Sequence, residues 1–338
     1  MKIGLTYNLR SADSASPAGW PEDAEEEFDS PETIEILVAA LESLGHEVER
    51  LGDGLPLLRR LADGCRPELV FNFAEGTGVG RSREARVPAV LEMLGIPYTG
   101  SDPLTLAVTL DKPCAKQLVR AAGVATPDWL LVDGDVEELR DRLDTLPLPV
   151  IVKPAFEGSS KGIHQSNLVE DGQRLFEAVE QMAAAYRQPI LVEEFIDGEE
   201  LTVGVVGHRP QKVLGIQRVR PTKPISGPFI YSLDYKRDVE SVQYECPARL
   251  SALDTRAVEA AALLVWRTLG CRDLARIDFR LRNHVPYFLE VNPLPGLNPK
   301  TSDLPLMAQA LGIKHTELVG RIVAAAQERL AETAAVRV

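Results

Sequence analysis

A lysine followed at once by a loop of small residues lies near the middle of the chain, in the run Lys153-Pro154-Ala155-Phe156-Glu157-Gly158-Ser159-Ser160-Lys161-Gly162. Residues 149–152 before it are apolar and predict a strand that carries the lysine to the loop. Glycines let a backbone approach a ligand closely, and serine hydroxyls and backbone amides donate hydrogen bonds to phosphate oxygens. The run therefore predicts a phosphate-binding loop, although an ordinary hairpin loop would have the same composition.

Two rival motifs fit this part of the sequence poorly, and the G-x-x-x-x-G-K-[ST] pattern does not occur. Residues 158–162 match the G-x-S-x-G pattern of hydrolases, with Ser160 as nucleophile, but that motif enters a helix. Here residues 163–168 predict a strand instead. Residues 76–80 follow a predicted strand but do not complete G-x-G-x-x-G, because Arg81 and Arg83 stand where a third glycine is needed. Neither a hydrolase nor a dinucleotide site is favoured.

Two acids and an amide form a second group, Asp278, Glu290 and Asn292, in apolar surroundings that predict paired strands. Residues two apart on a strand share a face, so Glu290 and Asn292 point the same way. A three-residue hairpin loop at 283–285 would place Asp278 opposite Glu290, whereas a two-residue loop would put them on opposite faces. Oxygen ligands of this kind suit Mg²⁺ that also holds phosphates. A solvated hairpin face is the alternative, but bare acids are costly in apolar surroundings.

Arg276 lies two residues before Asp278 and is expected on the same strand face. A guanidinium in that place would stand beside a metal and its phosphates. The same spacing fits a simple charge partner for Asp278.

Length and composition set limits on the kind of protein. The 338 residues predict two or three domains, at about 150 residues each. With 45% hydrophobic and 26% charged residues, wholesale disorder is excluded. No apolar run approaches the ~18 residues of a membrane span, and a net charge of −13 disfavours nucleic acid as a partner. The four cysteines are far apart, without a C-x-x-C pair, and predict reduced thiols in a cytoplasmic protein.

Strands and helices alternate in the first third of the chain, which predicts a small parallel sheet. Residues 8–30 are acidic and predict a mobile loop. The expected strands are 2–7, 46–51, 68–73, 129–132, 149–153, 163–168, 190–195, 201–206, 213–219, 275–281 and 287–291. The expected helices are one from Ser30 to Gly45, then 83–94, 103–122, 171–184, 253–269 and further helices at the end of the chain.

Taken in order, the motifs resemble the ATP-grasp superfamily and, within it, the D-alanine–D-alanine ligase-like branch, from about residue 68 to residue 312. The segments that carry the resemblance are 91–101, 110–112, 152–160, 193–200, 275–278 and 289–296. The resemblance implies an α/β ATP-grasp fold, with α+β character in the lid and a small parallel-sheet domain at the N-terminus. It also implies three domains: an N-terminal domain at 1–102, a central lid at 103–200, and a C-terminal domain at 201–338 with the magnesium and substrate site.

The resemblance further implies roles for individual residues. Those that would hold ATP are Lys112 and Lys153 at the phosphates, Ser160 in the loop, Glu193 and Ile196 at the adenine, and Glu200 at the ribose. Those that would hold magnesium, usually two ions and with Mn²⁺ as a substitute, are Asp278, Glu290 and Asn292. Those near the reacting acyl centre are Arg276, the Gly296 amide, Ser159 on the substrate side, and Lys236, which aligns with a family lysine.

The implied reaction is an ADP-forming ligation. A substrate carboxylate attacks the γ-phosphate of ATP, and an amine then attacks the acyl phosphate and releases phosphate. The resemblance implies small amino-acid or peptide substrates and a homodimer. D-alanine–D-alanine ligation is the leading activity. The alternatives are a ligase for another amino acid or small peptide, and a protein that binds ATP without ligating.

The substrate half departs from the family pattern. The glutamate that usually follows the first strand has no match, and the segment 71–76 replaces one that usually contains histidine. Arg237 stands where tyrosine is common, and one extra residue precedes Ser302, which can still serve the substrate carboxylate. A buried substrate ammonium needs an acidic partner, which Glu75 or an acid from 22–29 could supply. Arg237 favours a carboxylate-bearing or larger acceptor over D-alanine.

Overall fold

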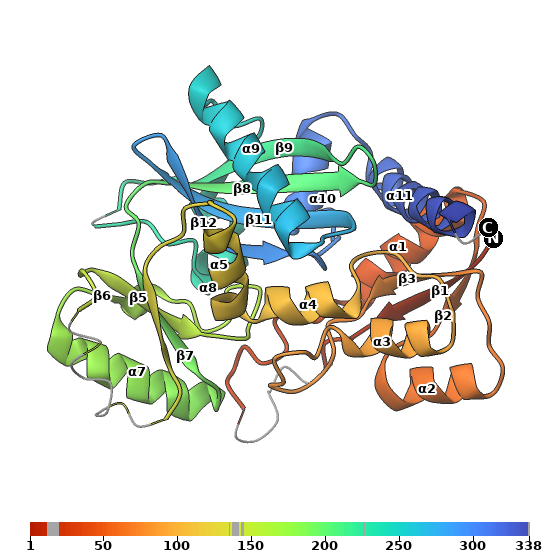
Figure 1. Cartoon of the computed structure of the whole chain (residues 1–338), viewed down its shortest axis with the longest axis horizontal. Coiled ribbons are helices and arrows are strands. Elements are labelled where there is room, and N and C mark those ends of the chain that lie inside the picture. Colours follow the sequence, from red (N-terminus) through yellow and green to blue (C-terminus); the bar gives the residue numbers. More distant parts are fainter. Residues whose placement is uncertain (12–19, 135, 137–141, 143–144, 226, 337–338) are drawn as a thin grey trace.

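Three β-sheets organise the part of the chain that this computed structural model describes, residues 1–11, 20–134, 136, 142, 145–225 and 227–336. In Figure 1 the N-terminal sheet lies at the right, the second sheet at the lower left, and the C-terminal sheet at the top. The α/β fold predicted from the sequence is confirmed, including the parallel sheet at the N-terminus.

The N-terminal sheet is parallel, in the order β2-β1-β3. The Ser30 hydroxyl accepts a hydrogen bond from the amide of Thr33 and starts the first helix, and Gly45 lies beyond its end with φ +83°. One short helix, α2, lies where none was predicted. The elements are β1 (Lys2–Tyr7), α1 (Pro31–Ser43), β2 (Glu47–Arg50), α2 (Gly54–Ala62), β3 (Leu69–Phe73) and α3 (Arg86–Met93).

The second sheet is antiparallel, in the order β4-β7-β5-β6, and one helix, α7, packs on it. The strand expected at 163–168 is wrong. His164 and Asn167 cap each other across a short 3₁₀ turn, so the chain enters a strand only at Leu168. The elements are β4 (Trp129–Val132), β5 (Val150–Pro154), β6 (Leu168–Val169), α7 (Gly172–Tyr186) and β7 (Ile190–Glu194).

The C-terminal sheet is antiparallel, in the order β10-β9-β8-β11-β12. Its helices are α8 (Leu233–Arg237), α9 (Ala252–Leu269), α10 (Asp303–Ala310) and α11 (His315–Val336). Its strands are β8 (Glu199–Gly207), β9 (Lys212–Pro221), β10 (Val242–Glu245), β11 (Asp273–Arg282) and β12 (Val285–Asn292). Between β9 and residue 250, where no element was predicted, the structure contains α8 and β10.

The helix expected over residues 103–122 is two helices, α4 (Pro103–Leu110) and α5 (Lys112–Ala121). Asp111 leaves the helical conformation, and its carboxylate accepts a hydrogen bond from the amide of Cys114, which caps α5. Helix α5 packs against α9 and β12, so these helices join the core of the C-terminal sheet. The domain boundaries at 102 and 200 stay a prediction.

The hairpin between β11 and β12 reaches its register differently from the expected three-residue loop. Its loop has two residues, Asn283 and His284, both with positive φ, as a tight hairpin turn requires. A bulge at Leu289 restores the pairing, so Asp278 still lies opposite Glu290. The loop is thus the two-residue alternative, and the two acids still face each other because the bulge compensates for its length.

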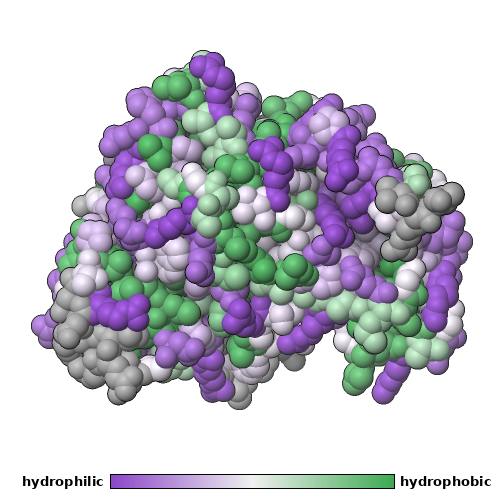
Figure 2. Space-filling view, viewed as in Figure 1, coloured by the Kyte–Doolittle hydropathy of each residue, from purple (hydrophilic) through white to green (hydrophobic). Residues whose placement is uncertain are grey.

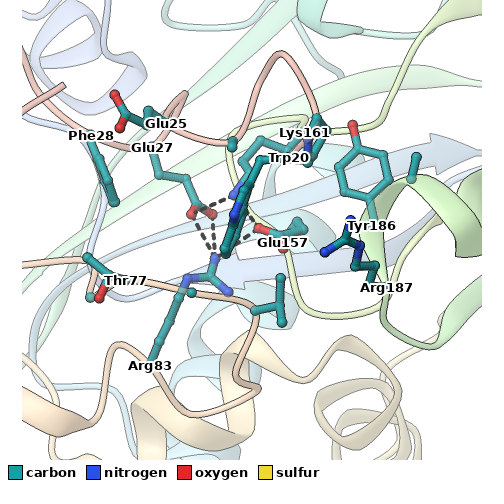
Figure 3. A pocket seen from close by; sticks show the side chains of 16 residues that line it. Trp20, Glu25, Glu27, Phe28, Thr77, Arg83, Glu157, Lys161, Tyr186 and Arg187 are labelled. Carbon is teal, nitrogen blue, oxygen red and sulfur yellow. Dashed lines mark hydrogen bonds and ion pairs between the residues drawn. The ribbon is translucent and has the colours of Figure 1, made fainter. Parts of the chain in front are cut away.

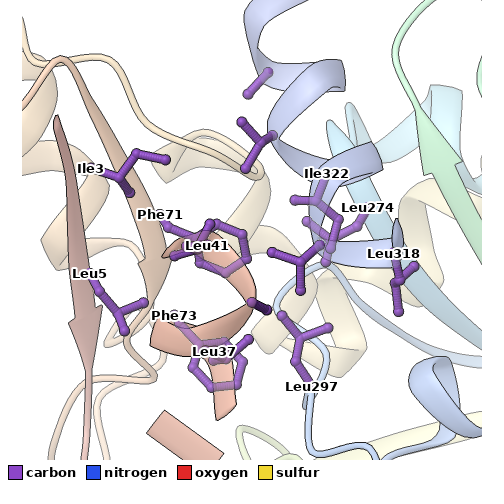
Figure 4. Close-up of a cluster of buried hydrophobic side chains, with 14 of the residues drawn as sticks. Ile3, Leu5, Leu37, Leu41, Phe71, Phe73, Leu274, Leu297, Leu318 and Ile322 are labelled. Atoms are coloured by element: carbon purple, nitrogen blue, oxygen red, sulfur yellow. The ribbon is translucent and has the colours of Figure 1, made fainter. Parts of the chain in front are cut away.

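The two ends of the chain share one hydrophobic core (Figure 4). Ile3 and Phe71 from the parallel sheet and Leu41 from α1 pack with Leu318 and Ile322 from α11. Because burial of apolar surface drives packing, the last helix fixes the N-terminal sheet to the C-terminal part, and α11 lies beside α1 in Figure 1.

The face shown in Figure 2 carries hydrophilic side chains throughout, with hydrophobic ones in separate patches rather than in a continuous band. Among the helices that the structure describes, none is both long and apolar enough to cross a bilayer.

The glycine that ends the Gly/Ser loop supports a stability test. Gly162 has φ +69°, and a Cβ there would lie 2.8 Å from Pro154 Cγ and 2.9 Å from Cζ of Tyr186. Gly123 also has positive φ, but its Cβ would meet open space. We expect Gly123→Ala to cost about 1–2 kcal/mol from the backbone alone, and Gly162→Ala to cost more, which thermal unfolding of both variants measures. Equal melting temperatures would contradict the crowding at Gly162.

Candidate active site

A cavity of about 80 Å³ lies between the second sheet and the C-terminal sheet. The strands β5 and β7 supply one wall, and β8, β11 and β12 supply the other. Charged side chains from both walls point into one space, which suits a highly charged ligand. The predicted site residues that line it are Lys153, Ser160, Glu193, Ile196, Glu200, Lys236, Arg276, Asp278 and Glu290.

Arg276 is the centre of the charge pairing in this cavity. Its guanidinium lies 3.0 Å from Asp278, 3.6 Å from Glu290 and 3.1 Å from Asp303. Asp303, in the first turn of α10, was missed by the sequence analysis because nothing local shows that α10 returns to β11. Asp303 also accepts a hydrogen bond from the Gln217 amide at 3.1 Å. Arg276 is therefore held by the acids of its own hairpin and by Asp303 of α10.

The pKa values of the two facing acids are shifted in opposite directions. Burial raises the pKa of Asp278 to about 6, with the nearby Glu290 and Asp303 adding to the rise against Arg276. Burial acts in the same direction on Glu290, but Lys112 at 3.3 Å, together with Arg276 and Lys153, holds the pKa of that carboxyl at about 2. A dication beside Asp278 would favour its ionised form.

The predicted metal ligands fit magnesium by their chemistry and by their facing. Asp278 lies opposite Glu290, and Arg276 lies opposite Asn292 on the same hairpin. Among the described residues, no three histidine, cysteine or acidic side chains gather as a metal cluster. The predicted set of two carboxylates and one amide oxygen suits Mg²⁺ that shares its coordination with phosphate oxygens.

The two lysines predicted to hold phosphates have internal partners. Lys153 lies 2.7 Å from Glu193, whose other oxygen lies 2.9 Å from Lys116. Lys116 is fully buried, and burial lowers its pKa to about 8 despite Glu193. The sequence analysis missed Lys116, which looks like any helix-surface lysine. Lys112 donates to the Glu157 carbonyl and lines a second, smaller cavity with Glu290 and Asn292.

Other groups line the part of the cavity assigned to the nucleoside. Glu200 lies 2.6 Å from Arg280, which also donates to the Ile196 carbonyl at 3.0 Å. The Ser160 hydroxyl donates to the Tyr231 carbonyl at 3.2 Å, and Ser160 has φ +58°. The strained serine therefore ties the Gly/Ser loop to the C-terminal part of the chain.

The remaining predicted residues lie in different settings. Lys236 is half-buried, 5.4 Å from the Tyr231 ring centre, and burial with Arg276 nearby lowers its pKa. Arg237 is exposed and lies 2.7 Å from Glu26. It therefore contacts the acidic segment rather than the cavity.

Ser302 and Gly296 lie together. The Ser302 hydroxyl accepts a hydrogen bond from the Asn298 amide, and a Cβ on Gly296 would lie 2.6 Å from that oxygen. Ser159 lies in the Gly/Ser loop with φ +50° and is half-buried. None of these three residues lines the cavity.

Residues 20–29 close over the Gly/Ser loop, contrary to the mobile loop expected for this part of the chain (Figure 3). The Glu27 carboxylate accepts a hydrogen bond from the Gly158 amide at 2.6 Å and lies 2.7 Å from Arg83 and 3.3 Å from Lys161. Burial would raise the pKa of Glu27, but Arg83 and Lys161 hold it at about 2. Residues 12–19 lie outside the described part of the chain.

A second carboxylate of this segment holds the other end of the loop. Asp23 accepts hydrogen bonds from the Gly162 amide and from the Tyr186 hydroxyl, both at 2.7 Å. Two acids of residues 20–29, Asp23 and Glu27, therefore accept hydrogen bonds from amides of the Gly/Ser loop, a role that composition does not reveal. A groove of about 430 Å³ lies beside them, with Trp20, Phe28 and Tyr186 on its walls.

Glu75, one of the two candidates for the substrate ammonium, is half-buried and makes no hydrogen bond or ion pair with any described residue. Burial raises its pKa well above the usual range, and Glu84 and Glu27 add to the rise. The other candidate, an acid from 22–29, is represented by Glu27, which already has two cationic partners. Of the two candidates, Glu75 is therefore the one without an ion pair to a described residue.

Comparisons with known proteins agree with this geometry. A family model described as the D-ala D-ala ligase C-terminus matches residues 118–324. An uncharacterised protein of Sinorhizobium fredii is 33% identical over 93% of this chain and 90% of its own length. The D-alanine–D-alanine ligase of Nitrosomonas europaea is 36% identical over 71% of this chain and 74% of its own length.

Solved structures give the same result for the whole chain. The D-alanine–D-alanine ligase of Bacillus anthracis has a TM-score of 0.76 at 26% identity, over 98% of this chain and 99% of that one. A structure of the same enzyme complexed with ATP has a TM-score of 0.74 at 25% identity, with the same coverage. The resemblance inferred from the motifs is confirmed, and the chain belongs to the D-alanine–D-alanine ligase family, the ADP-forming ligases of the ATP-grasp superfamily.

Proposed function

We propose that the protein joins two small amino acids, or an amino acid and a small peptide, through an acyl phosphate made from ATP. The observation that carries this proposal is the convergence of Arg276, Asp278 and Glu290 with Lys153 in one cavity. Phosphoryl transfer needs cations around the phosphates and oxygen ligands for magnesium, and little protein nucleophilicity. D-alanine is the leading substrate, since relatives named D-alanine–D-alanine ligase support it.

The internal ion pairs suggest how the site accepts ATP. Lys153 would exchange Glu193 for a phosphate, and Lys112 would exchange the Glu157 carbonyl for another. Lys116 would then keep Glu193 ionised, because it contacts the other carboxylate oxygen. Each lysine is thereby held near its phosphate position before ATP binds, which lowers the ordering cost of binding.

Arg276 would stabilise the charge that develops at the acyl carbon, and Asp303 would position it. Two magnesium ions held by Asp278, Glu290 and Asn292 would neutralise phosphate charge. The Gly296 amide would act with Arg276 at the acyl centre, and Ser302, which lies close to Gly296, would hold the substrate carboxylate. Ser159 would act on the substrate side, and Lys236, which lines the cavity, would lie near the reacting groups.

The substrate ammonium is proposed to bind at Glu75, which is not paired with a cation, rather than at Glu27. Arg237 pairs with Glu26 and would favour a larger or carboxylate-bearing acceptor only if that pair opens.

A homodimer and a cytoplasmic location stay predictions, which sedimentation analysis and cell fractionation can test. Reduced thiols in all four free cysteines agree with that location.

The products of the reaction test the chemistry. We expect turnover to require Mg²⁺ or Mn²⁺ and to release ADP and phosphate, because the carboxylate attacks the γ-phosphate. Coupled ADP assays with a screen of D- and L-amino acids, with and without a chelator, measure this and identify the substrate pair. AMP and pyrophosphate as stoichiometric products would contradict the assignment.

Two variants test the metal and phosphate roles. Glu290→Gln removes a magnesium ligand and Lys153→Ala removes a phosphate cation, so we expect each to lower kcat by about 10²–10³-fold. Lys212→Ala, which changes an exposed lysine on β9, is the matched control and should keep full activity. Thermal unfolding checks that the variants remain folded. A folded Glu290→Gln enzyme with substantial activity would place the metal elsewhere.

A third variant tests the ammonium site. If Glu75 holds the substrate ammonium, Glu75→Gln should raise KM for the amino acid about tenfold or more and leave KM for ATP unchanged, since a charge-assisted bond is lost on one side only. Equal KM values for the amino acid in both enzymes would reject Glu75. Efficient D-alanine dimerisation by the unaltered protein would reject the altered specificity while leaving the ligase assignment in place.

A further inference from the structure

A second arginine on β11 lines the active-site cavity, and the reaction proposed above does not use it. Arg280 lies two residues after Asp278, so it shares the strand face that carries Arg276 and Asp278 toward the cavity. Arg280 is only 5% exposed. A buried guanidinium is costly unless it is paired and hydrogen-bonded. The partners of Arg280 therefore indicate what this residue does.

Glu200 is the acid that pairs with Arg280. The two residues lie directly opposite each other on the antiparallel strands β8 and β11, and their side chains are 2.6 Å apart. Cross-strand neighbours of opposite charge stabilise each other's position. Glu200 is the residue expected at the ribose of ATP. Arg280 is thus in direct contact with a group that is expected to bind the nucleotide.

Other donors of Arg280 are taken up by the backbone at the same end of the cavity. The guanidinium donates to the Ile196 carbonyl at 3.0 Å, in the connection between β7 and β8, and to the Phe229 carbonyl. Its Cζ atom lies 4.5 Å from the centre of the Phe195 ring. A planar guanidinium can serve an acid, two carbonyls and a ring at once, which the compact ammonium of a lysine does not do. These contacts fix the guanidinium and, through it, Glu200.

The pairing leaves one oxygen of Glu200 available. Both hydrogen bonds that described residues donate to this carboxylate end on Oε2, one from Arg280 and one from the Tyr231 amide at 3.3 Å. Among the same residues, none donates to Oε1. The Glu200 side chain is 16% exposed and lines the cavity. Its Oε1 can therefore accept a hydrogen bond from a hydroxyl group that enters the cavity.

The surroundings of this pair suit a nucleoside rather than a phosphate. Phe195 and Ile230 belong to one apolar cluster, against which Ile151 and Ile163 pack, and all four line the cavity. Apolar walls suit a flat base. The carboxylate of Glu200 accepts hydrogen bonds from hydroxyls but repels phosphate oxygens. A sugar is therefore the part of a nucleotide that fits beside it.

We propose that Arg280 is a positioning residue for nucleotide selectivity, which holds Glu200 with Oε1 free for a ribose hydroxyl of ATP. The proposal rests on the ligase function proposed above and adds to it a way to distinguish a ribonucleotide from a nucleotide without sugar hydroxyls. Because the carboxylate is oriented before ATP binds, the ordering cost of that contact is lowered in advance. Arg280 acts through Glu200 and does not itself contact the ribose.

Equilibrium binding of two nucleotides provides the test, because it does not depend on the identity of the amino-acid substrates. Calorimetry with Mg²⁺ measures Kd for ATP and for 2′,3′-dideoxyATP, which lacks both ribose hydroxyls. We expect the unaltered protein to bind ATP about tenfold more tightly, since a hydrogen bond to a charged group is lost with the dideoxy nucleotide. Arg280→Met releases Glu200 and should weaken ATP binding about tenfold while changing Kd for the dideoxy nucleotide by less than about twofold.

Three further variants separate positioning from a general effect on the structure. Arg280→Lys keeps a charge beside Glu200 but cannot also hold both carbonyls, so we expect part of the selectivity to remain. Arg282→Gln is the matched control, because it removes an arginine of the same strand that pairs with Glu194 at 3.2 Å outside the Glu200 contact; it should keep full selectivity. In a Glu200→Ala background, Arg280→Met should have no further effect on selectivity.

Equal weakening of both nucleotides by Arg280→Met, or the same loss of selectivity in Arg282→Gln, would overturn the proposal, because Arg280 would then have only a structural role. A further loss of selectivity in the Glu200→Ala background would overturn it too, since Arg280 would then act on the nucleotide directly. Thermal unfolding checks each variant. If Arg280→Met does not fold, unchanged selectivity in a folded Arg280→Lys protein is the overturning result.

The unaltered protein separates this proposal from the ligase function. Equal affinity for ATP and the dideoxy nucleotide would overturn the role of Glu200 at the ribose, and with it the role of Arg280, without touching the ligase assignment. Selective ATP binding without ADP release for any amino acid would reject the ligase function and leave the role of Arg280 in place. Absence of ATP binding would reject both.

Discussion

The buried Arg276 guanidinium and the three acids around it impose the main constraint on this structure. Charges out of water must be paired, and Asp278, Glu290 and Asp303 come from β11, β12 and α10. These ion pairs join the strand, its hairpin partner and the returning helix at one buried cation. The same arrangement places oxygen ligands on one face and a cation at their centre.

The same rule of charge pairing governs the acidic segment at the N-terminus. A chain with a net charge of −13 must still hold polyanionic phosphates, which requires locally cationic surroundings. The carboxylates of Glu27 and Asp23 accept hydrogen bonds from amides of the Gly/Ser loop. Arg83 and Lys161 form ion pairs with Glu27 beside the loop. The groups expected to meet ATP are thus kept in place by internal partners that a ligand can replace.

Local sequence predicts the helices and strands correctly where interactions within a few residues set their ends. The Ser30 cap, the Gly45 end of α1 and the parallel sheet follow from patterns within a few residues. Prediction was less accurate where a single side chain redirects the backbone. Asp111 divides a helix in two, and the His164–Asn167 cap replaces a strand, because these side-chain bonds compete with regular structure.

The sequence by itself determined the family. It also predicts a phosphate-binding loop and three oxygen ligands, because these depend on residue types at fixed short spacings along one strand or loop. Only the tertiary structure decided that Asp303 holds Arg276, that Lys116 shares Glu193 with Lys153, and that Arg280 pairs with Glu200. Those pairs join residues far apart in the chain, so their proximity follows from packing between sheets. Burial, which sets the cost of each charge, is likewise a property of the folded molecule.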